Sequence, residues 1–279
     1  MPPPAEIKAP LRYFGSKWRL ADWIVRQLPE HTCYVEPFGG SAAVLLTKPK
    51  AEHEVYNDVS GDLVHFWRIL RERTGELAGA IARTPYSREE HLLAFEPCDE
   101  DLERARRFAV RSWQTIGGVK RASQGRGWRY SIASHNWSCP TAVWQKVPER
   151  IIAAADRMKG VYIERGSWRE VTERFDAPTT LHYWDPPYVL TSRSKNRDTY
   201  EDEFTDDDHQ GLLDLALEVE GMVVISGYPS ELYDDALQGW KRLETGGRSQ
   251  SNASTTEVLW LSPNSASPQL PLFAGAGNG

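Results

Sequence analysis

The sequence predicts an α/β fold, a doubly wound and mostly parallel seven-stranded sheet with a mainly helical subdomain inserted between the second and third strands. Two observations lead to this prediction. Short apolar segments that end at glycine or proline alternate with amphipathic helical segments over most of the 279 residues. The alternation breaks between about Thr74 and Pro148, where the chain is helical at first and then glycine-rich, basic and aromatic.

Seven segments have the apolar, β-branched and aromatic composition of strands and are bounded by turn residues. The first ends at Gly39-Gly40, the fourth at Pro186-Pro187 and the fifth at Gly227. The predicted strands are Cys33–Phe38, Glu54–Asp58, Val161–Glu164, Leu181–Asp185, Met222–Ser226, Lys241–Glu244 and Glu257–Leu261.

Most segments between these strands have helical patterns. Trp18–Leu28 carries leucine and isoleucine at i, i+4 and i+8, which places them on one face of a helix. Leu63–Glu72 has a similar apolar stripe, and Asp207–Glu218 begins with acidic residues that suit the positive end of a helix dipole. A further helix is expected around Asp99–Gln114, inside the insertion.

These boundaries divide the chain into three parts. Residues 1–73 and 148–262 form the predicted core, residues 74–147 form the inserted subdomain, and residues 263–279 form a tail. The tail is rich in proline, serine, glycine and alanine, so we expect it to be disordered. The chain shows neither a bilayer-spanning apolar run nor a signal sequence, so we expect a cytoplasmic protein without membrane contact.

The charge of the chain is unevenly distributed. The net charge of -6 argues against broad binding of polyanions. The basic stripe, defined as the basic residues from Arg104 to Arg129, is interrupted by no acid and is expected to contact phosphates. The candidate contacts with nucleic acid are Arg121, Arg126 and Arg129. Trp113, Trp128, Trp137 and Trp144 accompany the stripe, and packing of the small subdomain is the alternative role for them.

The sharpest chemical signal is Asp185-Pro186-Pro187-Tyr188 at the end of the fourth predicted strand, where open α/β sheets bind ligands. The prolines stiffen the turn and remove backbone donors. The carboxylate of Asp185 and a carbonyl of this turn can therefore accept both N–H bonds of an aromatic amine, while Tyr188 stacks on the ring. The turn suits a flipped-out base; the alternative is an ordinary strand-ending turn with an exposed aspartate.

A second signal follows the first strand, in Glu36-Pro37-Phe38-Gly39-Gly40-Ser41. Its glycines let the backbone approach a ligand, and the turn opens a helix whose N-terminus carries partial positive charge. Asp58 ends the second strand, where an acid is the usual partner of ribose hydroxyls. The G-x-G-x-x-G spacing of a dinucleotide site is not met, so a dehydrogenase is the least favoured class.

Together with Tyr13-Phe14-Gly15-Ser16-Lys17, these motifs resemble, in type and in order, those of the Dam-type (D12 class) DNA adenine methyltransferases. The resemblance extends from about Leu11 to Ser262. It implies a Rossmann-like methyltransferase fold in which the insertion recognises the target. It also implies direct in-line transfer of a methyl group from S-adenosylmethionine to N6 of a flipped-out adenine in double-stranded DNA, without a metal or a covalent intermediate.

The resemblance also assigns roles to individual residues. The catalytic residues that hold the target adenine would be Asp185, Pro186, Pro187 and Tyr188. The cofactor contacts would be Tyr13, Lys17, Glu36, Pro37, Phe38, Gly39, Gly40, Ser41, Asp58, Ser167, Trp168 and Asp185. Two positions depart from the family pattern, because Ser16 replaces a common glycine and Ser167-Trp168 replaces a common Asp-Phe pair.

Two other function classes remain open. One is a catalytically inactive DNA-binding protein with a methyltransferase fold, against which the intact Asp185-Pro186-Pro187-Tyr188 motif argues. The other is a methyltransferase that acts on RNA or on protein glutamine. Glutamine enzymes usually carry asparagine in place of Asp185, and the basic stripe favours nucleic acid.

The remaining predictions concern partners and metals. Gln269-Leu270-Pro271-Leu272-Phe273 resembles the peptide by which bacterial proteins dock on the replication sliding clamp, with a chance match as the alternative. The three cysteines are widely separated and the seven histidines lack ligand spacing, so we expect no disulfide and no metal site. We expect a monomer, because modification of one DNA strand at a time needs no symmetric dimer.

Overall fold

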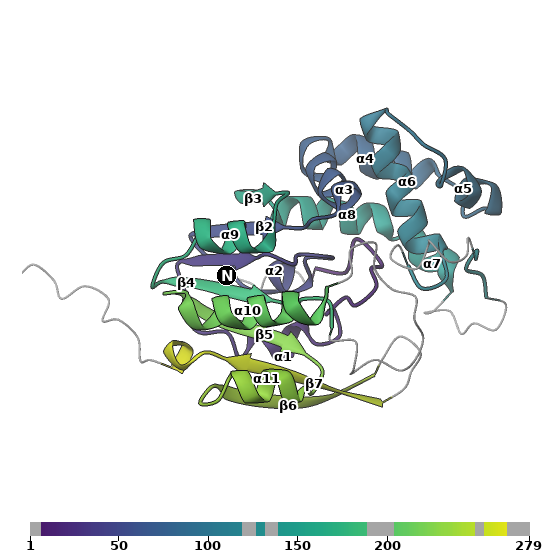
Figure 1. The fold of residues 1–279 in the computed structure, drawn as a ribbon. Helices are drawn as coiled ribbons and strands as arrows, with labels where there is room; N and C mark the ends of the chain where they lie inside the picture. Colours follow the sequence, from purple (N-terminus) through teal and green to yellow (C-terminus); the bar gives the residue numbers. More distant parts are fainter. Residues whose placement is uncertain (1–6, 119–126, 132–138, 189–203, 249–253, 267–279) are drawn as a thin grey trace, which may run out of the picture.

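The computed structural model describes residues 7–118, 127–131, 139–188, 204–248 and 254–266. Within them the strands form one seven-stranded sheet in the order β3-β2-β1-β4-β5-β7-β6 (Figure 1). The strands are β1 Cys33–Glu36, β2 His53–Asn57, β3 Val161–Glu164, β4 Thr180–Trp184, β5 Met222–Gly227, β6 Lys241–Arg248 and β7 Ser254–Leu261. The predicted α/β fold and all seven predicted strands are confirmed.

The strand pairing makes the sheet mostly parallel. β1 pairs in parallel with β2 and β4, with Val35 opposite both Val55 and His182, and parallel pairing continues to β3 and β5. β7 is antiparallel to β5 and to β6. The strand order changes direction between β1 and β4, and open α/β sheets bind ligands at the carboxyl ends of strands beside such a switch point.

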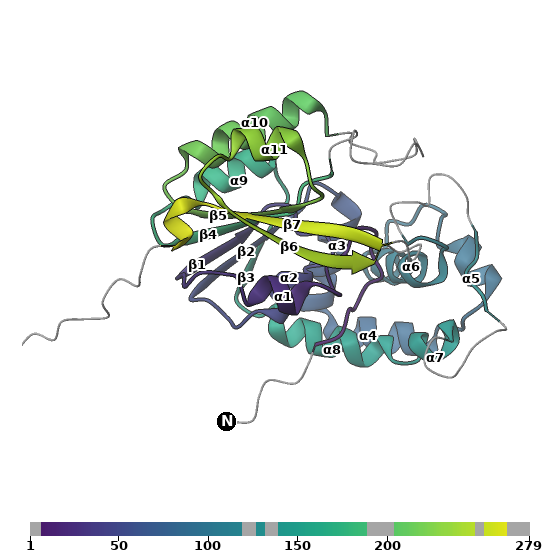
Figure 2. The same ribbon diagram turned by 90° about the horizontal axis from the view of Figure 1, so that it is seen from below.

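Helices cover both faces of the sheet, as a doubly wound fold requires (Figure 2). One face carries α1 Ala21–Val25 and α2 Ala43–Thr47, and the other carries α9 Trp168–Arg174, α10 Asp206–Glu218 and α11 Glu231–Ala236. Side chains alternate along β5, so that Val224 joins one buried apolar cluster while Val223 and Ile225 join the other.

The first helix is shorter than the sequence predicts. Only Ala21–Val25 is α-helical, whereas the apolar pattern predicted Trp18–Leu28. The flanking residues form tighter turns, in which the N–H of Leu20 bonds to the carbonyl of Lys17 and the N–H of Leu28 to that of Val25. The apolar spacing is nevertheless used, because Leu20 and Leu28 pack against the core around the buried Ile24.

A cluster of helices between β2 and β3 lies beside the sheet (Figure 1). Within the described residues it comprises α3 Gly61–Glu72, α4 Thr74–Arg83, α5 Arg88–Leu93, α6 Asp101–Gln114, α7 Pro140–Trp144 and α8 Val147–Arg157. α4 packs on α8, and α6 packs on α3 and α4. Buried side chains of this cluster, such as Phe66, Phe108 and Ile151, belong to the same apolar core as Tyr34 of β1.

The end of the described chain differs from the expectation of a disordered tail from residue 263 onward. Pro263–Ala266 form a 3-10 helix after β7, and the side-chain amide of Asn264 donates to the carbonyl of Gly221 at 2.9 Å. Gln269–Phe273, the segment predicted to bind a sliding clamp, lies outside the described residues. No helix among the described residues is both long and apolar enough to cross a membrane.

A buried ion cluster fastens α8 to the sheet. The carboxylate of Glu54 on β2 lies 2.7 Å from Lys48 Nζ and 2.6 Å from Arg157 Nη1, and all three residues are buried. Burial alone would raise the pKa of Glu54, but hydrogen bonds from Arg157 and Lys48 outweigh it and lower the pKa. This carboxylate therefore stabilises the fold above its ordinary pKa of 4.5, and that stabilisation is lost as the pH falls through the lowered value.

We predict that Glu54→Gln lowers the free energy of unfolding at neutral pH by about 3–5 kcal/mol, because it leaves two buried cations without a counter-charge. Urea denaturation checks this. Glu164→Gln, which removes a partly exposed partner of Arg174, is the matched control and should change the stability by less than about 1 kcal/mol. Equal effects of the two substitutions would contradict the assigned role of the cluster.

Candidate active site

A cavity of about 930 Å³ lies at the carboxyl ends of the central strands and extends to α3 and α6. It brings together every residue that the sequence assigned to catalysis or to the cofactor, although they come from distant parts of the chain. These lining residues are Tyr13, Lys17, Glu36, Pro37, Phe38, Gly39, Gly40, Ser41, Asp58, Ser167, Trp168, Asp185, Pro186, Pro187 and Tyr188. The cavity is therefore the candidate site.

Asp185 follows β4 directly and is held from two sides. Its Oδ1 accepts a hydrogen bond from Ser226 Oγ on β5 at 3.0 Å and lies 2.8 Å from Lys17 Nζ. Ser226 is itself fixed by Tyr183, whose hydroxyl lies 2.9 Å away. Asp185 retains 19% side-chain exposure, so one carboxylate edge is anchored while the group stays accessible from the cavity.

Lys17 is the buried cation of the site, with 5% side-chain exposure. It donates a hydrogen bond to the hydroxyl of Tyr188, and its amine lies 4.7 Å from the centre of that ring. Burial alone would lower the pKa of Lys17, but the negative charges of Asp185 and Glu257 outweigh it and raise the pKa. The contacts of Lys17 with the Asp-Pro-Pro-Tyr turn were not predicted, and its assignment to the cofactor stays a prediction.

Glu257 is a site residue that the sequence analysis missed. It lies on the antiparallel strand β7, is buried, and accepts a hydrogen bond from the Tyr188 hydroxyl at 3.5 Å. Burial raises its pKa, and the charge of Asp185 adds to the effect while that of Lys17 opposes it. Its strand was predicted, but no local motif indicates that an acid there faces the end of β4.

The glycine turn after β1 is shaped by close backbone contact. The N–H of Gly39 donates to the carbonyl of Asn57 at 2.7 Å, and a Cβ on Gly39 would lie 2.2 Å from the ring of Tyr56. No side chain fits there, which is why this position is glycine. Gly40 follows with φ +49°, in the left-handed region that favours glycine.

Asp58 and Asn57 tie the ends of three strands together. The carboxylate of Asp58 accepts the N–H of Gly40 and the N–H of Ser60, both at 2.9 Å. The amide of Asn57 donates to the carbonyl of Pro37 at 2.8 Å and accepts the N–H of Gly166 at 2.9 Å. Asn57 was not among the predicted site residues, although it adjoins Asp58, because its role depends on a partner 109 residues away.

Glu36 is buried at the end of β1 with one carboxylate oxygen hydrogen-bonded. Its Oε2 accepts the Leu45 N–H at 3.1 Å and the Tyr34 hydroxyl at 3.2 Å. Burial raises the pKa of Glu36 to about 8, and the nearby charge of Asp185 adds to this, while the two hydrogen bonds oppose it. A buried carboxyl with a raised pKa beside a cavity is well placed to face a cationic ligand.

Aromatic side chains form the side of the cavity near β3. The rings of Phe38 and Trp168 stack with centroids 5.8 Å apart and planes at 26°, and Phe204 meets both rings. Trp168 therefore supplies an aromatic surface at the position where the family pattern has phenylalanine. Ser167, in place of the family's aspartate, precedes α9 and also lines the cavity.

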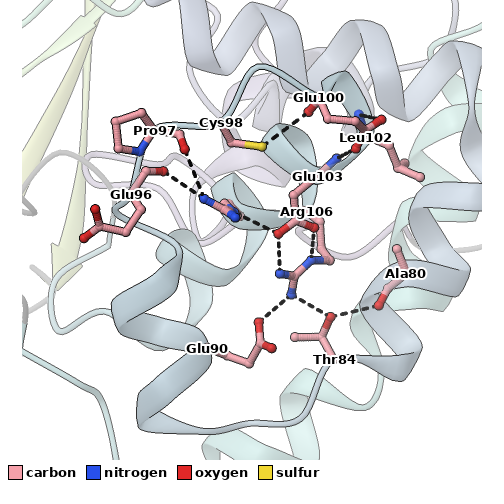
Figure 3. Close-up of polar contacts among 11 residues, drawn as sticks. Ala80, Thr84, Glu90, Glu96, Pro97, Cys98, Glu100, Leu102, Glu103 and Arg106 are labelled. Carbon is pink, nitrogen blue, oxygen red and sulfur yellow. Dashed lines mark hydrogen bonds and ion pairs between the residues drawn. The ribbon is translucent and has the colours of Figure 1, made fainter.

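The basic stripe is not the continuous basic face that the sequence suggested. On α6, Arg106 pairs with Glu90 at 2.7 Å and with Glu103 at 2.6 Å, and Arg107 also pairs with Glu103, at 2.8 Å (Figure 3). Glu103 lies one helical turn earlier on α6, directly before the stripe, whereas Glu90 comes from α5, so the pairing with Glu90 is visible only in three dimensions. These two arginines are paired with acids and join helices of the cluster, and contact of the stripe with phosphates stays a prediction.

Only one of the three candidate nucleic-acid contacts can be placed. The carbonyl of Arg129 accepts the Tyr86 hydroxyl at 2.7 Å, and Arg129 does not line the cavity. Arg121 and Arg126 lie outside the described residues. Trp113 and Trp144 are buried and donate to the carbonyls of Pro10 and Thr84, so these tryptophans pack the cluster.

The sheet order, the glycine turn and the acids at the carboxyl ends of β1, β2 and β4 define a Rossmann-like methyltransferase fold. Residues 13–246 match the family described as D12 class N6 adenine-specific DNA methyltransferase, and the chain belongs to that family. The resemblance inferred from the motifs is thereby confirmed. Membership also argues against the RNA and protein glutamine alternatives.

Similar proteins agree with the family assignment. The chain is 27% identical over 249 residues to a DNA adenine methylase of Serratia marcescens, covering 83% of this chain and 87% of that one. It is 26% identical over 228 residues to a DNA adenine methylase of Escherichia coli strain K12, covering 77% of each. A DNA N-6-adenine-methyltransferase of phage P1 is 25% identical over 250 residues, which are 84% of this chain and 32% of the phage protein.

The raised pKa of Glu36 makes a prediction about stability and pH. Because the pKa is higher in the folded chain than the ordinary value of 4.5, the stabilisation from the neutral carboxyl is complete below 4.5 and is lost as the pH rises through about 8. Glu36→Gln keeps an oxygen for Leu45 and Tyr34 but cannot ionise. We expect the variant to match the wild type near pH 5 and to exceed its stability by more than about 1 kcal/mol above pH 8.

Chemical denaturation at a series of pH values checks this prediction. Glu164→Gln is the control, since Glu164 is partly exposed and should leave the pH dependence unchanged. A constant difference between Glu36→Gln and the wild type at every pH would show that Glu36 does not carry the raised pKa.

Proposed function

We propose that the chain transfers a methyl group from S-adenosylmethionine to N6 of an adenine that has left the DNA duplex and entered the cavity at Asp185. The observation that carries the proposal is the convergence of Asp185, Lys17 and Tyr188 on the same cavity as the glycine turn and Asp58. Family membership supplies the reaction type and the DNA substrate. The base must be extruded, because the N6 atom cannot reach such a cavity from within the base stack.

The residues around the cavity fit S-adenosylmethionine. The turn at Gly39 admits no side chain, so a ligand can approach the backbone, and the carboxylate of Asp58 beside it suits ribose hydroxyls. Phe38 and Trp168 offer an aromatic surface for an adenine ring, and the carboxyl of Glu36 suits the cationic methionine end. When bound there, S-adenosylmethionine supplies an electrophilic methyl group on a positively charged sulfur.

Asp185 and the following turn hold the target amine. The carboxylate of Asp185 and the carbonyl of Pro186 accept the two N–H bonds of N6, which draws the nitrogen out of conjugation and directs its lone pair at the methyl group. S-adenosylmethionine held there would supply the methyl group and leave as a neutral thioether, and the Asp185 carboxylate that accepts an N–H bond of N6 would pass the released proton to water. Most of the rate enhancement comes from positioning and from fixed charges, because no covalent enzyme intermediate is formed.

Tyr188 provides the stacking surface for the extruded base. Its hydroxyl is held by Lys17 and faces Glu257, and the centre of its ring lies 4.4 Å from the centre of the Tyr228 ring. A ring fixed at both its edge and its face loses little conformational freedom when a base stacks on it. Lys17 thus acts on the base through Asp185 and Tyr188.

The other parts of the predicted function are proposed on the same basis. We propose that residues 74–147 recognise the target sequence and that Arg121, Arg126 and Arg129 contact DNA. Binding of Gln269–Phe273 to a sliding clamp, a monomeric state and a cytoplasmic location also remain predictions. The basic composition of residues 120–129 supports the proposed contacts with DNA, because each phosphate contact adds to salt-dependent affinity.

We predict that Asp185→Ala abolishes methyl transfer to DNA, with activity at least about a thousandfold lower, while S-adenosylmethionine still binds. Incorporation of labelled methyl groups into DNA and calorimetric titration of the donor check the two parts. Asp214→Ala, on the exposed side of α10, is the matched control. Methyl transfer by the Asp185→Ala variant would refute the assigned role of Asp185.

A second prediction concerns Trp168, on the aromatic side of the cavity. Trp168→Ala should weaken S-adenosylmethionine binding by about tenfold, because it removes one stacking surface, whereas Trp168→Phe should bind nearly as well as the wild type. Calorimetric titration in the absence of DNA measures both. Equal affinity of the alanine variant and the wild type would show that the donor's adenine lies elsewhere.

A further inference from the structure

Two arginines of the basic stripe differ from their neighbours because they line the cavity. Arg104 and Arg111 lie seven residues apart on α6, which is close to two helical turns, so both face the same way. Both reach Asp62 in the first turn of α3: Arg104 Nη2 lies 2.6 Å from Asp62 Oδ1, and Arg111 Nη2 lies 2.8 Å from Asp62 Oδ2. The anion-facing triad, as we call these three residues, joins α3 to α6 at the edge of the cavity.

The triad carries a positive charge that the other arginines of α6 do not. Arg106 and Arg107 share the two carboxylates of Glu90 and Glu103, so that group is neutral. In the triad two guanidinium groups share the single carboxylate of Asp62. Hydrogen bonds from both arginines lower the pKa of Asp62 against the effect of its burial, so the carboxylate is ionised and the triad keeps a charge of +1.

Donors remain available on both arginines. Arg104 uses Nε and Nη2 on Asp62, and 41% of its side chain is exposed. Arg111 uses Nη2 on Asp62, 20% of its side chain is exposed, and its guanidinium lies 5.5 Å from the centre of the Phe108 ring. A guanidinium has five N–H donors in a planar fork that matches an oxyanion.

The surroundings of the triad also favour an anion. The twelve-residue helix α3 begins at Gly61, and its N-cap Ser60 makes no side-chain hydrogen bond to the first turn. The N–H groups there carry partial positive charge. The guanidinium of Arg165 packs against Gly61 from the end of β3, since a Cβ on Gly61 would lie 2.9 Å from Arg165 Cζ.

We propose that Arg104 and Arg111, oriented by Asp62, form a binding site for a backbone phosphate that flanks the extruded adenine. The inference rests on the proposed function, because a nucleotide that enters the cavity brings its own phosphates to the cavity mouth. Phosphate contacts of this kind fix register without selecting sequence. The carboxylate of the methyl donor has the same oxyanion chemistry, so the experiment has to separate the two sources.

The first test compares Arg104→Gln with Arg107→Gln, which removes the same charge from the same helix away from the cavity. Binding of a fluorescent duplex DNA is measured at several salt concentrations. We expect Arg104→Gln to bind about tenfold more weakly, with the slope of log affinity against log salt reduced by about 0.9, and Arg107→Gln to match the wild type. Equal DNA affinity and equal salt slope of the two variants would overturn the proposed phosphate site.

A second variant distinguishes phosphate binding by the triad from a purely structural role. Asp62→Asn removes the one acid and raises the charge of the triad to +2. A phosphate site then binds DNA at least as tightly as the wild type, with an unchanged or steeper salt slope. If the triad only holds α3 against α6, Asp62→Asn weakens DNA binding and lowers the melting temperature in parallel with Arg104→Gln. That result would overturn the proposal.

The last measurement tests whether the triad binds the methyl donor. S-adenosylmethionine affinity is titrated for Arg104→Gln without DNA, and we expect no more than a twofold change, about 0.4 kcal/mol. Loss of donor affinity with DNA affinity retained would assign the triad to the donor's carboxylate and overturn the phosphate site. Failure of the proposed function is distinct, since it appears as methyl transfer by the Asp185→Ala variant rather than as a change in DNA affinity.

Discussion

The arrangement of the site depends on the buried amine of Lys17. An ammonium group out of water is costly unless it is paired and hydrogen-bonded, and Lys17 meets this requirement with Asp185 at 2.8 Å, the Tyr188 hydroxyl and the nearby charge of Glu257. These partners come from the end of β4 and from β7. One cation therefore joins the N-terminal segment, the Asp-Pro-Pro-Tyr turn and the antiparallel edge of the sheet, and removal of Asp185 takes away its nearest counter-charge.

The same segment connects the cavity to the helical cluster. The backbone of Arg12 is hydrogen-bonded in both directions to Ser112 Oγ of α6, and Trp113 donates to the carbonyl of Pro10. A few residues later, Ser16 meets Ser41 of the glycine turn at 2.8 Å and Lys17 meets Asp185. The helical cluster, which we propose to bind DNA, is thus linked through one short stretch of chain to the Asp-Pro-Pro-Tyr turn and to the glycine turn after β1.

Local patterns predicted most of the fold and the membership of the site, because strands, glycine turns and the Asp-Pro-Pro-Tyr turn each carry their own signal and parallel strands bring their ends to one edge. Long-range pairing was not accessible. Glu257 and Asn57 act through partners that no local motif connects to them, and the pairing of Lys17 with Asp185 was not predicted. The charge of α6 was misjudged for the same reason, since Glu90 and Asp62 lie elsewhere in the sequence.

The central claim is that Asp185 and the Pro186 carbonyl grip the amine of an extruded adenine beside the methyl donor. The most direct measurement is a crystal structure of the protein with duplex DNA and a non-reactive analogue of S-adenosylmethionine. The account predicts that N6 of the target adenine lies within hydrogen-bond distance of both oxygens, with its ring against Tyr188. An adenine that remains stacked in the duplex, or one bound away from Asp185 while the analogue occupies the cavity, would contradict it.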